Sequence, residues 1–288
     1  MGDVHSDFVE LDNVLQIFDK WRQDFTQSYT QTFVSSSLYK LLDPIIRINL
    51  ISWNPLKDQD SIENLDWFIK LVKYCTSLKD SNGIYLDFAV IPNIFDSVIA
   101  QKLTTFIKVW DCFSAQESVC LCNHFKFIYI DNPLVNVSSN INKFLKELYN
   151  RMIEFCDFIF MPIFPARLIE NEGSGALDFL IHQIQTSVQF LENCILWVGI
   201  LDMKKLKNLV IVNIINRFIV LGLTQITNIF ISINIFETVP LEWFKDPSDE
   251  DARILPNFMR AMQNILVNLQ QTNQDDHEGI EKIRLVII

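Results

Sequence analysis

Residues 43–56, DPIIRINLISWNPL, place the charged side chain of Arg47 in an otherwise apolar helical run. Such a run is typical of a helix that packs on most of its sides, and Pro55 is expected to stop it because proline cannot continue a regular helix. The stretch contains no catalytic motif. It predicts an interior packing element of a larger helical body, in a protein that holds other molecules together.

The composition favours helices along the whole chain. The 288 residues include 23 Phe and 6 Trp but only 7 Gly, and 49% of them are hydrophobic. Bulky side chains can bury a large core, whereas a turn-rich β-sandwich or a nucleotide loop needs more glycine. We therefore expect an all-α fold, an elongated stack of helical hairpins that is irregular and solenoid-like. A helical domain is expected at residues 1–252, and a C-terminal helix with a polar tail at 253–288.

Apolar periodicity and turn residues predict the order of the helices. A loop is expected at 131–138, and the helix expected at 203–236 is predicted to break near Gly222. The expected helices cover residues 8–43, 62–78, 92–110, 115–130, 139–160, 176–199, 203–236 and 254–272.

Two local signals set individual boundaries. Ser114 and Glu117 form a capping-box pattern, in which the hydroxyl accepts the third helical N–H and the carboxylate returns to the N–H of the cap residue. Pro162 and Pro165 cannot both stay within a regular helix, so they are expected to end the long helix at about Phe160.

The net charge limits the classes of partner. It is -11 at pH 7, whereas binding to a phosphate backbone needs clustered Lys and Arg. Direct binding of DNA or RNA is therefore not expected. Acidic runs in the first 24 residues and at 246–251 are expected to be solvated faces, with basic protein partners as the alternative.

Cysteine usage and the N-terminus indicate the compartment. The six cysteines, at positions 75, 112, 120, 122, 156 and 194, lack the spacing of a secreted disulfide scaffold, which favours a reducing environment. The first ten residues, MGDVHSDFVE, match neither a secretory signal nor an Arg-rich transit peptide. The cytosol and the nucleus remain.

The segment 209–236 is very apolar, and Arg217 is its only charged residue. Asparagines and glutamines interrupt it, and no unbroken apolar run approaches the roughly 18 residues of a typical membrane span. The segment predicts a pair of buried core helices, and no contact with a membrane is expected.

Motifs for common enzyme chemistry are missing. The sequence has no GxGxxG or GxxxxGK[ST] phosphate loop, no HExxH and no GxSxG, and Gly173-Ser174-Gly175 is interpreted as a loop. The candidate metal set is Cys112, Cys120, Cys122 and His124. Because side chains meet on a helix at separations of three or four, the Cys-x-Cys-x-His spacing does not converge on one ion, and buried, inert cysteines are favoured.

Four further polar features lie outside these motifs. His182 lies among glutamines and is expected to be a hydrogen-bonded helical residue rather than a general base. Arg47 and Arg217 lie within apolar helices, so each should have a carboxylate or several carbonyls as partner. An internal ion pair or a helix-end clamp is the favoured role, with a partner-facing role as the alternative. Asp275-Asp276 is expected to be solvated.

Two longer patterns support a resemblance. One is RxxLxxWxPL, from Arg47 to Leu56, and the other is LxxxxxWxGIL, from Leu191 to Leu201. The chain resembles the C-terminal helical domain of the GC-rich sequence DNA-binding factor family, in its Pax-binding protein branch, over roughly residues 8–245. Further matching positions are Trp21-Arg22, Tyr29 to Phe33, Leu41, Pro44, Trp67, Val90 to Pro92, Lys102-Leu103, Met161-Pro162, Pro165, Phe179 to Gln183, Leu209, Asn216, Arg217 and Trp243-Phe244.

The resemblance implies a nuclear, non-enzymatic protein without a cofactor. Its first functional implication is a scaffold role in pre-mRNA splicing, in the late (intron-lariat) spliceosome and its disassembly, beside the tuftelin-interacting G-patch protein and a DEAH-box helicase. The alternative is a transcriptional adaptor or DNA-associated regulator that links Pax transcription factors to chromatin-modifying machinery. Longer members carry a charged N-terminal region and a coiled coil, and this chain is expected to begin almost at the helical domain.

Overall fold

The computed structural model describes residues 10–58, 61–79, 83, 85–130, 139–226, 238–240, 243, 260, 263 and 267. Within these residues every regular element is a helix, and one isolated bridge joins Lys79 to Tyr85. The all-α prediction is confirmed for this part of the chain. The expected boundary at 252/253, the loop at 131–138 and most of the helix at 254–272 lie outside it.

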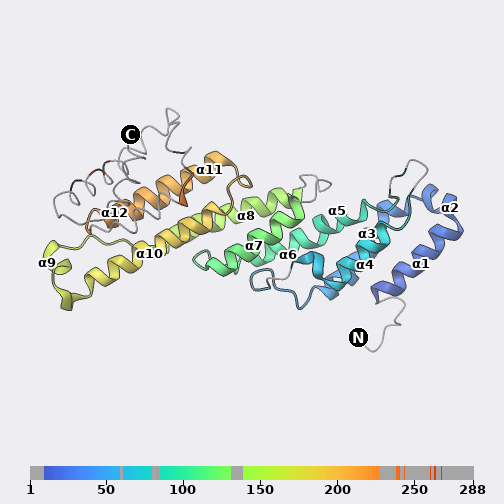
Figure 1. Cartoon of the computed structure of the whole chain (residues 1–288), viewed down its shortest axis with the longest axis horizontal. Helices are drawn as coiled ribbons and strands as arrows, with labels where there is room; N and C mark the ends of the chain where they lie inside the picture. Colours follow the sequence, from blue (N-terminus) through green and yellow to red (C-terminus); the bar gives the residue numbers. More distant parts are fainter. Residues whose placement is uncertain are drawn as a thin grey trace. The chain divides into compact units, whose positions relative to one another are not determined.

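The helices follow one another without a sheet among the described residues (Figure 1). In chain order they are α1 (Leu11–Asp24), α2 (Thr26–Gln31), α3 (Val34–Asn49), η2 (Ile62–Asn64), α4 (Asp66–Cys75), α5 (Val90–Ile94), η3 (Phe95–Ile99), α6 (Ala100–Ile107), α7 (Ala115–Tyr129), α8 (Ser139–Cys156), α9 (Ala166–Ile169), η4 (Glu172–Ser174), α10 (Ala176–Ile195), α11 (Met203–Asn208), η5 (Leu209–Ile219) and α12 (Val220–Leu223).

The chain divides into two compact units. Unit 1 comprises Met1–Trp110 and Val119–Leu148, and unit 2 comprises Asp111–Ser118 and Tyr149–Ile288. The boundary between them falls inside α7 and α8.

The core of unit 1 is built around α3, which packs on α5 and η3. Leu38, Leu42 and Ile46 are fully buried, and their spacing of four residues places them on one face of the helix. Burial of each such side chain stabilises the fold by roughly 1.5–3 kcal/mol. The predicted interior packing element is therefore present in α3.

The ends of α3 differ from the prediction. The helix passes through Pro44 and ends at Asn49, before Pro55 is reached. The side chain of Asn54 accepts the N–H of Leu56 at 3.0 Å and so forms a tight turn there. This turn, with Trp53 and Leu56 buried in it, replaces the predicted last part of the helix.

The long first helix that the sequence predicts is three helices. α1 ends at Asp24, and α2 and α3 are separated by Phe33, whose φ of 52° lies in the left-handed region. The hydroxyls of Thr26 and Thr32 donate to backbone carbonyls four residues earlier, at 2.7 and 2.8 Å. Such bonds compete with the regular helical pattern, which apolar periodicity alone does not report.

Two predicted helix starts are confirmed, one of them with a different cap. Pro92 lies in the first turn of the helix that α5, η3 and α6 form together, and α7 begins at Ala115. Ser114 Oγ accepts the N–H of Glu117 at 3.3 Å, as expected for a capping box. The Glu117 carboxylate, however, accepts the N–H of Asp111 at 3.0 Å, so the reciprocal half of the box is not formed.

A buried polar network joins four segments of unit 1. Arg22 on α1 and Asp87 before α5 are 1% and 0% exposed, and Arg22 Nη1 lies 2.8 Å from Asp87 Oδ2. Tyr29 on α2 donates to Asp87 Oδ1 at 2.8 Å, and its hydroxyl lies 3.1 Å from that of Tyr74 on α4. Burial opposes the charge on Arg22, but its hydrogen bonds to Asp19 and Asp87 raise its pKa. The guanidinium therefore stays charged inside the unit.

The arginines that the sequence analysis selected are not buried. Arg47 pairs with Asp43 and also donates to the carbonyl of Ser97 at 2.8 Å, and Arg217 lies 3.5 Å from Asp157. The two arginine side chains are 44% and 52% exposed. The predicted carboxylate partners are confirmed, but an internal location is wrong. Arg47, in the last turn of α3, fits the helix-end clamp.

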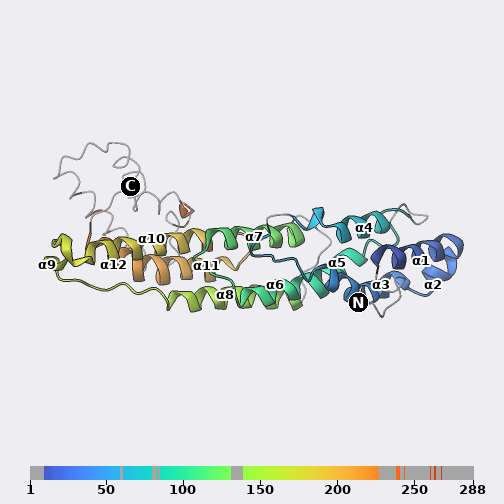
Figure 2. The same ribbon diagram turned by 90° about the horizontal axis from the view of Figure 1, so that it is seen from below.

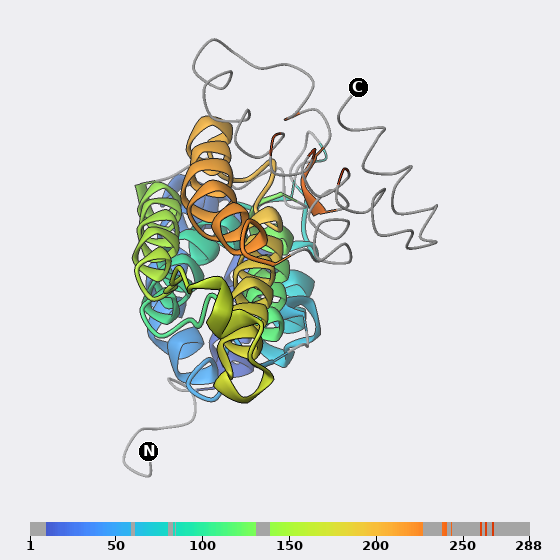
Figure 3. The same ribbon diagram turned by 90° about the vertical axis from the view of Figure 1, so that its left-hand side faces the viewer.

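Unit 2 contains an antiparallel hairpin of two long helices. The first is α10, and the second is formed by α11, η5 and α12 in succession (Figures 1 and 3). Gly222 lies inside α12, where a Cβ atom would meet Ile184 Cγ1 of α10 at 2.5 Å. The glycine thus allows close approach of two helices, and the second helix ends one residue later, at Leu223, which fits the predicted break near Gly222. α8, predicted to continue to about Phe160, ends at Cys156.

One helix among the described residues, Met203–Leu223, is long and apolar enough to cross a membrane by length and composition. Of its most apolar 18-residue window, 56% is buried within the protein, and it packs on α10. It agrees with the first of the two predicted core helices. The second, up to residue 236, lies outside the described residues.

Replacement of Asp87 by Asn is predicted to destabilise unit 1 by about 3 kcal/mol, because it leaves the buried guanidinium of Arg22 with less than its full countercharge. Urea unfolding with an unchanged m-value measures this loss. The matched control is Asp43→Asn at the exposed pair with Arg47, where a change below about 1 kcal/mol is expected. Equal losses in the two variants would contradict a special role for the buried pair.

Replacement of Gly222 by Ala is predicted to destabilise the chain by about 1–2 kcal/mol, although alanine is the better helix former. The added methyl group has no room beside Ile184. In thermal unfolding, Ile184→Ala should therefore cost less in the Gly222→Ala background than in the wild type. A more stable Gly222→Ala variant would show that the helices do not pack this closely.

Candidate functional site

The predicted metal candidates do not form a ligand set. Cys112 belongs to unit 2, whereas Cys120, Cys122 and His124 belong to unit 1, and all four are buried. In the described part of the chain, no group of three or more His, Cys, Asp or Glu residues could hold a metal ion. His124 Nε2 lies 2.9 Å from the carbonyl oxygen of Asp58, which accounts for its position.

The thiols are unsuited to act as nucleophiles. All six cysteines are free and buried. Burial raises the pKa of Cys75 to about 12 and that of Cys156 to about 11, and it also raises the pKa values of Cys112, Cys122 and Cys194. Because the thiolate is the reactive species, these groups are protonated and unreactive at neutral pH.

His182 lies on the exposed face of α10. The predicted helical location of His182 is confirmed, and its backbone carbonyl accepts the hydroxyl of Thr186 at 2.9 Å, whereas a hydrogen bond of its ring stays a prediction. Gly173-Ser174-Gly175 forms η4 and the turn that leads into α10, in agreement with the interpretation as a connecting segment. Asp275-Asp276 lies outside the described residues.

The connector between α8 and α9, residues 157–165, is not helical (Figure 2). It exposes large apolar side chains. Phe158, Phe160 and Ile163 are 71%, 67% and 74% exposed, whereas the intervening Ile159 and Met161 are buried. Such alternation is typical of extended backbone with one face on a core. The sequence predicts that the helix continues to about Phe160 and that a kinked connector follows, whereas the helix ends at Cys156 and the connector begins there.

The connector is held in place by unit 2. Gln225 accepts the N–H of Phe164 and donates to the carbonyl of Pro162, both at 2.8 Å. Phe158 lies edge-on to the ring of Phe155 at a centroid distance of 5.3 Å. The exposed rings are therefore presented from a positioned backbone, as anchors at a protein interface are.

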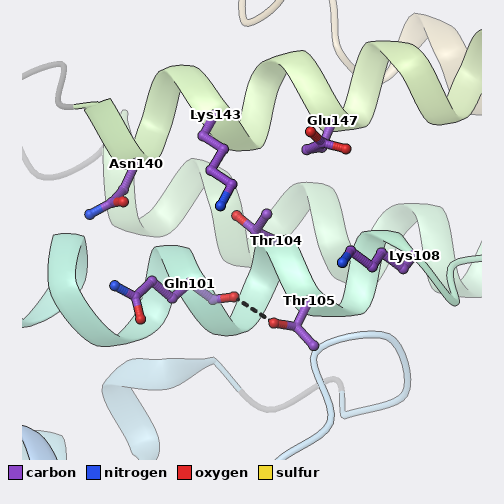
Figure 4. Close-up of a pocket in the computed structure, with 7 residues that line it drawn as sticks. All are labelled: Gln101, Thr104, Thr105, Lys108, Asn140, Lys143 and Glu147. Carbon is purple, nitrogen blue, oxygen red and sulfur yellow. Dashed lines mark hydrogen bonds between the residues drawn. The ribbon is translucent and has the colours of Figure 1, made fainter.

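A second candidate site is a polar groove in unit 1 between α6 and the first turns of α8 (Figure 4). Its volume is about 350 Å³, which is within the range of small ligand sites. It is lined on one side by Gln101, Thr104 and Thr105 of α6 with Lys108 directly after that helix, and on the other by Asn140, Lys143 and Glu147 of α8. No sequence pattern indicated it, because its two sides come from separate helices.

The chain is similar to known proteins. Residues 11–83 match the family model described as GC-rich sequence DNA-binding factor-like protein. The chain belongs to this family, and the prediction of the family and of its Pax-binding branch is confirmed.

Relatives extend the similarity over most of the chain. The mouse Intron Large complex component GCFC2 is 27% identical over 99% of this chain, and the human PAX3- and PAX7-binding protein 1 is 31% identical over 91%. The Arabidopsis thaliana Transcriptional repressor ILP1 is 22% identical over 67%. The chain spans 38%, 30% and 21% of the lengths of these three proteins, respectively.

The free energy of unfolding of unit 1 is predicted to decrease as the pH falls, because of the titration of His124. Burial lowers the pKa of this side chain, and the hydrogen bond to Asp58 opposes the shift only in part. The unfolded chain, with a histidine pKa of about 6.5, therefore binds more protons as the pH falls, so stability present above that pH is lost below it.

Unfolding free energies at pH 7 and pH 5 test this dependence. The decrease should be smaller in His124→Gln than in the wild type, whereas His182→Gln, at an exposed histidine, should keep the wild-type decrease. The same decrease in all three proteins would show that His124 does not titrate differently on unfolding.

Proposed function

We propose that this chain is a non-enzymatic nuclear interaction domain that acts in pre-mRNA splicing, in the late spliceosome and its disassembly. Family membership supports this, as does the similarity over almost the whole chain to a protein named as an Intron Large complex component. The tuftelin-interacting G-patch protein and a DEAH-box helicase, implied by the resemblance, are the first partners to test.

The observation that carries the proposal is the exposed apolar face of the connector. Aromatic side chains dominate the affinity of protein interfaces when they are buried at the centre of a contact. Phe158 and Phe160 are rigid rings, and the bonds of Gln225 to the connector limit its freedom before binding. Such preorganisation lowers the entropic cost of association.

The non-enzymatic part of the proposal rests on the chemistry of the described side chains. The thiols are held protonated by burial. The buried ion pair of Arg22 with Asp87 has further hydrogen-bond partners inside unit 1. Arg22 also donates to Asp19, and Asp87 also accepts from Tyr29. A group that is already bonded on all sides and closed to solvent is suited to fix a structure and not to act on a substrate.

A second candidate function is that of a transcriptional adaptor that joins Pax transcription factors to chromatin-modifying machinery. The names of two relatives, PAX3- and PAX7-binding protein 1 and Transcriptional repressor ILP1, favour it. Both candidate functions use a protein surface, so the identity of the bound proteins separates them.

Affinity purification from nuclear extract tests the first function. The full chain should retain splicing proteins, identified by mass spectrometry, and Phe158→Ser with Phe160→Ser should lose most of them, because the two rings are the proposed anchors. Ile51→Ser with Ile69→Ser, which changes two side chains 73% and 54% exposed in unit 1, is the matched control. Circular dichroism verifies that each variant is folded.

Two outcomes would count against this function. One is a folded wild-type chain that retains no splicing protein, and the other is equal retention by the connector variant. Recovery of Pax and chromatin-modifying proteins in their place would favour the second function. Binding to duplex DNA at physiological salt, weakening steeply as salt rises, would contradict the exclusion of nucleic acid that the net charge of -11 supports.

A further inference from the structure

Two lysines in the polar groove of unit 1 have no partner among the described residues. Lys108, directly after α6, and Lys143 on α8 are exposed, and neither makes a hydrogen bond or ion pair with another described residue. Figure 4 shows Lys143 extending from α8 towards Thr104, and Lys108 turning its ammonium group towards the same space. In a chain with a net charge of -11, this is a local concentration of positive charge that faces one groove.

Most other donors of the groove are already used. The hydroxyl of Thr104 donates to the carbonyl of Ala100 at 2.7 Å, and that of Thr105 donates to the carbonyl of Gln101 at 3.0 Å (Figure 4). Asn140 Nδ2 donates to the carbonyl and the carboxylate of Asp96, at 3.3 and 3.2 Å. These side chains therefore shape the walls and supply no donor to a ligand.

Gln101 is the third group with donors to spare. Its side-chain oxygen accepts from Arg47 Nη2 at 3.1 Å. This bond fixes the amide and leaves its NH₂ group for a ligand. The hydrogen-bond donors of the groove that have no acceptor among the described residues are thus two ammonium ions and one amide NH₂. Such a set of donors is suited to bind an oxyanion.

Glu147 limits the kind of anion. It is the one carboxylate among the residues that line the groove, and it lies on α8 at the end that Lys108 occupies (Figure 4). A long polyanion would meet this carboxylate and, beyond the groove, the negative charge of the chain. A single carboxylate on a short side chain meets neither.

We propose that the groove between α6 and α8 binds a single carboxylate side chain of a peptide segment in a partner protein, through Lys108, Lys143 and Gln101. The proposal rests on the proposed interaction function only in that the ligand belongs to another protein. Its test uses purified components, so its failure leaves the co-purification result unaffected.

Fluorescence anisotropy with the full chain tests the proposal. The probe is a fluorescein-labelled peptide with a single glutamate among uncharged residues, and a peptide with glutamine at that position is its control. Lys108→Gln and Lys143→Gln should each weaken binding of the glutamate peptide about tenfold, the typical effect of losing one charge-assisted hydrogen bond. Lys73→Gln with Lys146→Gln, at exposed lysines that do not line the groove, should leave it unchanged.

The carboxylate of Glu147 provides a test in the opposite direction. Glu147→Gln should tighten binding of the glutamate peptide, whereas Glu63→Gln, which makes the same charge change at an exposed site outside the groove, should not. Because each of these variants removes a charge and keeps a polar group of similar size, circular dichroism should show them folded.

Three results would overturn the proposal. The first is the absence of any binding, and the second is an equal loss in the control lysine variant, which would indicate general electrostatic attraction. The third is binding of single-stranded RNA or a phosphorylated peptide that depends on Lys108 and Lys143 while the glutamate peptide does not bind. That result would assign the groove to a phosphate ligand.

Discussion

The ion pair between Arg22 and Asp87 is the constraint on which unit 1 depends. Apolar contacts between helices are not directional, so they allow neighbouring helices to shift at small cost. Hydrogen bonds from a buried guanidinium and two tyrosines require one arrangement of α1, α2, α4 and the turn before α5. An arrangement that separated these groups would leave a buried charge without a partner, which costs several kcal/mol.

In unit 2 the comparable constraint is the close packing of two helices. Gly222 lets α12 approach Ile184 on α10, and Gln225, three residues later, binds the backbone of the connector. The same end of the helical hairpin therefore sets both the helix spacing and the path of the exposed rings. In unit 1, Arg47 has a related role, because it joins the end of α3 to η3 and also orients Gln101 at the groove. Surface features of each unit thus depend on specific interior or near-interior contacts.

Much of the fold could be predicted from the sequence, because long helices carry their own periodicity. α10 and the helix that begins at Ala115 were placed closely by apolar spacing and capping residues. Local breaks were harder to predict, since the hydroxyls of Thr26 and Thr32 and the left-handed Phe33 interrupt a pattern that still looks apolar. The buried pair was missed because its two members are 65 residues apart, and no local feature distinguishes Arg22 from Arg47. The groove was missed for the same reason, and the exposed face of the connector was missed because residues 158–164 contain no polar side chain that would mark the exposed positions.

Hydrogen–deuterium exchange of the full chain, free and within the complex purified from nuclear extract, tests most directly whether this protein acts through surfaces held on a fixed helical scaffold. A scaffold of this kind predicts slower exchange at residues 157–165 in the complex, with the slow exchange of α3 and α10 the same in both states. Faster exchange in α3 or α10 on binding, with no change at the connector, would contradict it, because partners would then reorganise the interior and not use a surface that is already formed.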